Sequence, residues 1–99
     1  MATFVLLSRL SPALMEDPRG RRAVGKEWLE KVSKYSPDVE WQQHYALLGH
    51  YDFMDIFLAS DFESAHKVAY ISRHEGALEV EIWEALPYER YLEIVDEIS

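Results

Sequence analysis

The chain has 99 residues, which is enough for one domain with one hydrophobic core and too few for two. It carries 18 acidic and 10 basic side chains, so its net charge of −8 excludes the broad basic surface that binding to nucleic acid or an anionic membrane requires. The absence of cysteine excludes disulfides and thiolate chemistry, and no apolar run approaches the ~20 residues that span a bilayer. We therefore expect a single cytoplasmic domain over residues 1–99, with no nucleic-acid or membrane partner.

The first half of the chain predicts a strand, a helix and a second strand. Residues 3–10 (TFVLLSRL) are apolar and β-branched, which is typical of a strand buried on both faces. Asp17 and Pro18 have the residue types of a helix N-cap and first helical position, and they precede an amphipathic pattern over residues 19–35. Residues 39–48 then alternate between apolar and polar side chains, as a strand does.

The second half predicts a strand, a helix, a strand and a final helix. Residues 53–59 form a strongly apolar strand, and Ser60 is placed to cap the helix that ends before Gly76. Residues 78–83 alternate as a fourth strand, and Pro87 opens an amphipathic helix. This order predicts an α+β fold of ferredoxin-like βαββαβ type with a C-terminal helix, in which two helices cover one face of a four-stranded antiparallel sheet.

Alternation divides the sheet residues into two sets. The set predicted to face the helices and form the core is Phe4, Leu6, Trp41, Tyr45, Leu47, Met54, Ile56, Leu58, Leu78, Val80 and Ile82. The opposite set is Val5, Leu7, Arg9, Gln42, His44, Phe53, Asp55, Phe57, Glu79, Glu81 and Trp83. The second set is too apolar for a free surface, so it predicts a homodimer whose two sheets pack face to face.

Charged residues on this second face form candidate pairs. The first and third strands are central in a ferredoxin-like sheet, so Asp55 is expected beside His44, and Arg9 beside Glu79 or Glu81. A carboxylate next to an imidazole can be a plain ion pair or a unit for proton transfer, and the pattern leaves both interpretations open. The two glutamates, two residues apart on one strand, could also be charges that keep an edge strand soluble.

Other kinds of site lack the spacing they need. The histidines have no metal-binding spacing, no serine lies in a G-x-S-x-G turn, and the glycines are too isolated for a phosphate-binding loop. We therefore expect neither a metal nor a cofactor. A basic cluster near the start of the first helix is interpreted as a solvated helix end; it consists of Arg19, Arg21, Arg22 and Lys26.

The stretch LLGHYDFMDIFLASD resembles the GYD-domain family, named for a Gly-x-Tyr-Asp-like corner. The corner residues here are Gly49, Tyr51 and Asp52. The resemblance extends back to TFVLLSRLSP, which is similar to the family's first strand, and forward to Glu81 and Ala85, so that it covers about residues 3–86. The corner residues are interpreted as turn chemistry, with a glycine for positive φ and an aspartate that binds backbone amides.

The resemblance implies a ferredoxin-like domain that dimerises as an α/β barrel. The wider group of dimeric α/β barrels includes cofactor-free monooxygenases, isomerases, haem enzymes and small-molecule sensors, so it implies a fold more than a reaction. This chain departs from the family at three positions. It has Leu58 where members often carry Glu, and Val80 and Ile82 where they often carry Thr.

Three functions stay open at this point. The first is a homodimer that binds or senses a small apolar or aromatic molecule near the sheet, with Arg9, Tyr45, Phe57 and Trp83 as ligand-binding residues. The second is a cofactor-independent enzyme of monooxygenase or isomerase type, with His44, Asp55 or Glu81 as the acid–base group. The third is a dimeric structural adaptor without a pocket. Whether the protein is an enzyme is left undecided.

Overall fold

The computed structural model, which describes residues 1–99, has a four-stranded antiparallel sheet with the strand order β2-β3-β1-β4. The strands are β1 (Ala2–Leu10), β2 (Glu40–Ala46), β3 (Phe53–Ala59) and β4 (Ala77–Ala85). The helices are α1 (Pro12–Met15), α2 (Arg21–Tyr35), α3 (Phe62–His74) and α4 (Tyr88–Ile98). The α+β, ferredoxin-like arrangement is therefore confirmed. No helix has the length and apolar character needed to cross a membrane.

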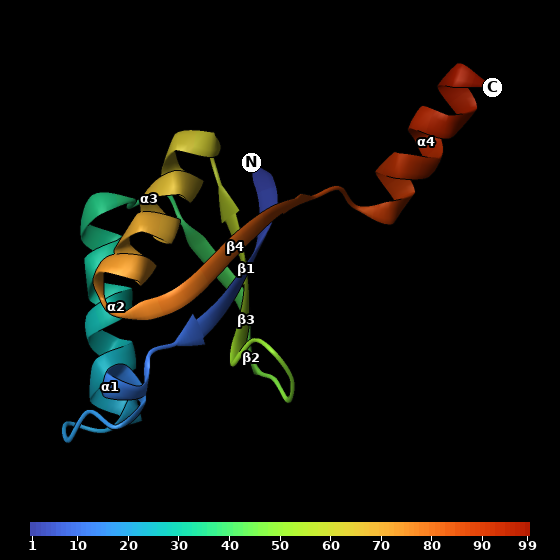
Figure 1. Ribbon diagram of the computed structural model, residues 1–99. Helices are drawn as coiled ribbons and strands as arrows, with labels where there is room; N and C mark the ends of the chain where they lie inside the picture. Colours follow the sequence, from blue (N-terminus) through green and yellow to red (C-terminus); the bar gives the residue numbers. More distant parts are fainter.

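The hydrophobic core lies between the sheet and the layer formed by α2 and α3 (Figure 1). At its centre the rings of Phe4 on β1 and Phe57 on β3 stack with their centroids 5.5 Å apart, and both side chains are fully buried. Apolar side chains from α2, α3 and β4 complete this core, including Val32, Val68 and Val80.

The side of β3 that faces the helices is the opposite of the predicted one. Antiparallel partners point to the same side of a sheet, and Phe57 pairs with Phe4 while Asp55 pairs with Leu6. Phe57 and Asp55 therefore face the helices, and the alternate residues of β3 face away from them. The prediction was wrong because β3 carries large apolar side chains on both faces, so alternation does not distinguish them.

A bulge in β2 reverses part of that strand as well. The register shifts between Trp41 and Gln43, so Trp41 and His44 both lie on the helix side, while Tyr45 pairs with Met54 on the other face. The predictions of a core position for Tyr45 and an outer position for His44 were wrong for this reason. Leu78, also predicted in the core, is exposed beside a second register shift in the pairing of β1 with β4.

The first helix begins later than predicted. Gly20, with φ of 87°, is the N-cap of α2, because Asp17 is occupied by hydrogen bonds from the backbone and side chain of Arg19. Between β1 and α2, where no element is predicted, lies the one-turn helix α1, whose N-cap Ser11 accepts a hydrogen bond from an amide in that turn.

The cap of α3 also differs by one residue. Asp61 caps the helix by accepting a hydrogen bond from the amide of Ser64, whereas Ser60, the predicted cap, donates its amide and hydroxyl to Asp38. The predicted helix end is confirmed, because Gly76 follows the last turn with φ of 117°.

One face of the sheet is not covered by α2 or α3. This open face consists of Val5, Leu7, Arg9, Gln43, Tyr45, Met54, Ile56, Leu58, Glu79, Glu81 and Trp83. Helix α4 lies beyond the end of β4, away from α2 and α3, and makes no extensive contact with another element (Figure 1). The radius of gyration is accordingly 15.1 Å, against about 13 Å for a compact domain of this length.

Candidate functional site

A cavity of about 460 Å³ lies between α2 and the helix-facing side of the sheet. Its apolar walls include Leu14, Trp28, Leu29 and Phe53, and the polar side chains that reach it include His44 and Asp55. A concave apolar space of this size with a few convergent polar groups has the form of a small-molecule site.

The His44–Asp55 pair lines this cavity. Nδ1 of His44 lies 2.6 Å from Oδ1 of Asp55, which is a short hydrogen bond between two neighbouring strands. Asp55 is only 6% exposed, whereas about half of the His44 side chain is exposed. The predicted neighbour relation of the two residues is confirmed, but the pair faces the helices and not the open face.

Burial perturbs the acid of this pair. Desolvation raises the pKa of Asp55 above its ordinary value, and the nearby His44 and Arg21 oppose that rise without cancelling it. An acid that has a raised pKa, is hydrogen-bonded to an imidazole and lies next to a cavity is suited to accept or donate a proton.

Aromatic packing holds the imidazole in place. The bulge in β2 sets Trp41 against His44, with the two ring centroids 5.2 Å apart, and the ring of Trp28 on α2 lies 5.0 Å from that of Trp41. Nε1 of Trp28 donates a hydrogen bond to Oγ of Ser72, 3.0 Å away, which fixes the indole between α2 and α3. The amphipathic pattern over residues 19–35 did not indicate this contact of Trp28.

The other predicted site residues lie elsewhere. Glu81 pairs in register with Leu7 on the open face, so the structure does not bring it together with His44 and Asp55. Arg9, Tyr45 and Trp83 also belong to the open face, whereas Phe57 is fully buried in the core.

The corner residues connect the β2–β3 turn to the end of β1. Oδ2 of Asp52 accepts a hydrogen bond of 2.8 Å from the amide of Leu10, and the amide of Asp52 donates to the carbonyl of Ser8 at 2.9 Å. Gly49 has φ of 150°, the positive value expected of it. Gly49 and Asp52 therefore have the turn chemistry predicted for them, although the amide that Asp52 binds belongs to a distant strand.

Charged groups surround this corner on the open-face side. His50 and Arg9 both contact Glu79, at 2.6 and 3.4 Å, and they lower the pKa of that carboxyl group, His50 more than Arg9. Partial desolvation, together with the neighbouring Glu81, raises the pKa of Tyr51. These exposed interactions fix the corner against β4 and contain no buried acid.

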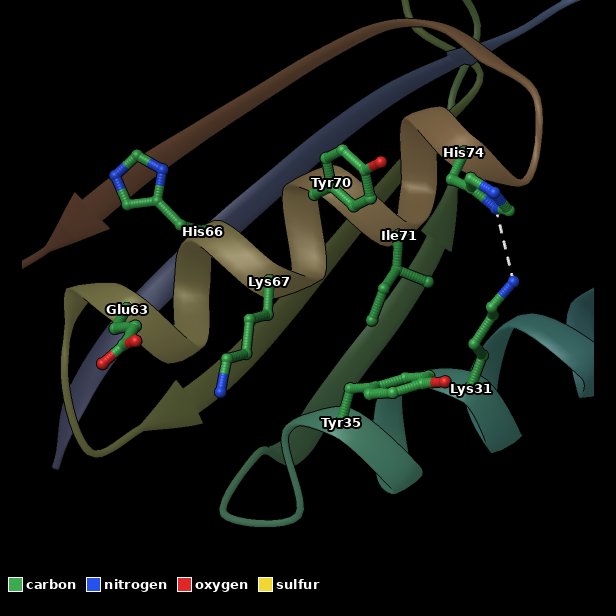
Figure 2. Close-up of a pocket in the computed structure, with 8 residues that line it drawn as sticks. All are labelled: Lys31, Tyr35, Glu63, His66, Lys67, Tyr70, Ile71 and His74. Atoms are coloured by element: carbon green, nitrogen blue, oxygen red, sulfur yellow. Dashed lines mark hydrogen bonds between the residues drawn. The ribbon is translucent and has the colours of Figure 1, made fainter.

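A second hollow, of about 630 Å³, lies along the outer surface between α2 and α3 (Figure 2). Lys31 crosses it to Oε1 of Glu75 at 2.6 Å and to Nδ1 of His74 at 3.3 Å. Ile71 is the one buried side chain that lines it, and the others are exposed or half-buried. This hollow has no buried polar group. We therefore regard the cavity beside Asp55 as the candidate site.

No group of three or more histidine and acidic side chains lies close enough together to hold a metal ion.

Comparison with known proteins supports the fold. The family model of the GYD domain matches residues 4–95, and no curated protein matches the chain significantly. The solved structure of TTHA0845 from Thermus thermophilus has 21% identity and a TM-score of 0.54, with 88% of this chain and 95% of that chain covered.

Two further solved structures have the same fold at lower identity. FFRP-DM1 has 17% identity and a TM-score of 0.58, over 87% of this chain and all of that chain. A chlorite dismutase mutant from Candidatus Nitrospira defluvii has 16% identity and a TM-score of 0.63, over 93% of this chain and 43% of that chain. At these identities the likeness concerns the fold alone.

Proposed function

This chain belongs to the GYD-domain family, and we propose that it forms a homodimer in which each subunit binds a small molecule in the cavity between α2 and the sheet. The observation that carries the proposal is the buried Asp55 at the cavity wall, hydrogen-bonded to His44. Burial of a carboxylate costs free energy that an apolar residue at the same position would not. Binding of a ligand that hydrogen-bonds to the pair would account for a destabilising acid at this position.

The open face and α4 support the homodimer. Val5, Met54, Ile56 and Leu58 are only half-buried on the open face, and Trp83 is exposed beside them. The apolar side of α4, which includes Tyr91 and Leu92, is likewise exposed. A second copy packed on the open face would cover these surfaces, and a two-fold axis lets each subunit do so for the other.

Native mass spectrometry of the purified protein tests both parts of the proposal. We expect a mass of twice the chain's 11.6 kDa. A co-purified ligand would add a reproducible further mass. If no ligand co-purifies, we expect the protein to bind apolar and aromatic fragments. Leu29→Trp should fill the cavity and abolish that binding, whereas Ser33→Trp, on the exposed side of the same helix, should preserve it. A monomer mass would contradict the dimer, and equal binding by the two variants would contradict the cavity.

A cofactor-independent enzyme is the second candidate, favoured by the raised pKa of Asp55 beside His44. Such an enzyme would use the pair to take a proton from a bound substrate. In that case His44→Gln should abolish turnover of the identified ligand while binding persists, and Glu81→Gln, on the opposite face, should leave turnover unchanged. Binding without any turnover would favour a sensor, and a dimer that binds nothing would favour the structural adaptor.

A further inference from the structure

Three basic side chains line the candidate cavity of this acidic protein. Arg21, Arg22 and Lys26 come from the first turns of α2. The guanidinium carbon of Arg21 lies 5.3 Å from the centre of the Phe53 ring, and neither arginine forms an ion pair or a side-chain hydrogen bond. Lys26 has only an exposed contact of 4.0 Å with Glu30.

The basic cluster seen in the sequence thus separates into two parts. Arg19 does not line the cavity, because its guanidinium is bonded to Asp17 and Glu27, and these bonds raise the pKa of Arg19. Arg21 and Arg22 have no such partners. Both side chains are exposed, as expected of a solvated helix end, but they also line the cavity, where a ligand can reach them.

The acids that line the cavity form no ion pair with these arginines, although Arg21 is near enough to Asp55 to oppose the rise in its pKa. Asp55 is hydrogen-bonded to His44, and Glu75 is paired with Lys31 at 2.6 Å. The cavity therefore combines apolar walls, a hydrogen-bonding pair and two arginines that form no ion pair. A guanidinium presents a planar set of donors that matches the two oxygens of a carboxylate.

We infer that the ligand is an amphipathic carboxylate, with an apolar or aromatic body between Trp28 and Phe53 and its charged group bound by Arg21 and Arg22. This inference rests on the proposed function, since it specifies the ligand class of the same cavity. A volume of about 460 Å³ lies within the range of pockets that hold drug-sized molecules.

The test compares matched acids and amides that differ in charge but hardly in shape. Benzoate and benzamide, naphthalene-2-carboxylate and naphthalene-2-carboxamide, and decanoate and decanamide are titrated into the ¹⁵N-labelled full chain, and dissociation constants are taken from the amide shifts of cavity residues. We expect each acid that binds to do so roughly tenfold or more tightly than its amide.

Two double variants separate the cavity cations from the overall charge. R21Q/R22Q should remove the preference for the acid and leave amide binding unchanged. K34Q/K67Q removes the same charge from exposed positions outside this cavity and should retain the preference.

The outcomes distinguish the two proposals. Equal binding of acid and amide, or an acid preference that survives R21Q/R22Q, would overturn the carboxylate inference and leave the small-molecule site standing. If no probe of either kind shifted the cavity amides, the small-molecule site would be refuted and the inference with it.

Discussion

Replacement of His44 by Phe isolates the hydrogen bond to the buried acid. The new ring can keep the contact with Trp41, whose centroid lies 5.2 Å from that of His44, but Asp55 loses its only side-chain partner while remaining 6% exposed. An unsatisfied buried polar group costs about 1–3 kcal/mol, and more when it is charged. Because the site is half open at His44, water can partly solvate the freed carboxyl group, and we expect a loss of about 1–2 kcal/mol in the free energy of unfolding at neutral pH.

The pH dependence of this loss has a definite sign. Burial already raises the pKa of Asp55 above the ordinary 3.8, and loss of His44 raises it further. Between the ordinary and the raised pKa the native state binds more protons than the unfolded state, so its stability falls as the pH rises through that window. The loss caused by His44→Phe should therefore be small near pH ~4 and complete near pH ~8.

Urea unfolding followed by tryptophan fluorescence measures this difference across the pH range. His66→Phe, at an exposed position of α3 without a carboxylate partner, is the matched control and should change stability little at any pH. In an Asp55→Asn background the pH-dependent part of the His44→Phe effect should disappear. A loss that does not vary with pH, or an equal loss in the control, would refute the argument from the buried carboxyl group.

Three further substitutions test the fold. Phe57→Ala should cost about 3–5 kcal/mol in urea unfolding because Phe57 is fully buried. Leu78→Ala, at an exposed position of β4 outside the open face, should cost less than half of that; a reversed order would contradict the burial of these two side chains. Hydrogen-bonded hydroxyls and an amide lower the pKa of Asp38 to about 2, so wild-type stability should fall as the pH falls from 3.8 towards about 2. Acid titration of Asp38→Asn should show lower stability at neutral pH and a smaller fall, because Glu79 still contributes to it. Gly76→Ala should lower stability by about 1–3 kcal/mol in thermal unfolding, because φ is 117° and the new Cβ would lie 3.2 Å from Leu14; an unchanged melting temperature would contradict the strained geometry.

The order of the elements could be predicted because each has a clear period. The bounds of β3, Phe53–Ala59, agree with the prediction, and Gly76 ends α3 as expected. The orientation of β3 could not be predicted. Its two faces differ in shape more than in polarity, and only the pairing with Phe4 on a strand about fifty residues earlier decides between them.

The candidate site was predicted in part. Strand order alone placed His44 beside Asp55, which the structure confirms. The side that Asp55 faces depends on the pairing of β3 with β1, and the side that His44 faces depends on the bulge after Trp41, for which the β2 sequence has no glycine or other marker. The position of Arg21 at the cavity could not be predicted either, because α2 begins only after the turn at Gly20.

The central position of β1 has a consequence for synthesis of the chain. β1 is made first, yet both of its partners, β3 and β4, lie more than forty residues later. During translation the apolar run Thr3–Leu10 therefore remains without a hydrogen-bonding partner until β3 leaves the ribosome. An unpaired apolar strand is a site for aggregation or for chaperone binding. Slower elongation between β1 and β3 would lengthen this interval, so the yield of soluble protein should depend on the translation rate of that segment.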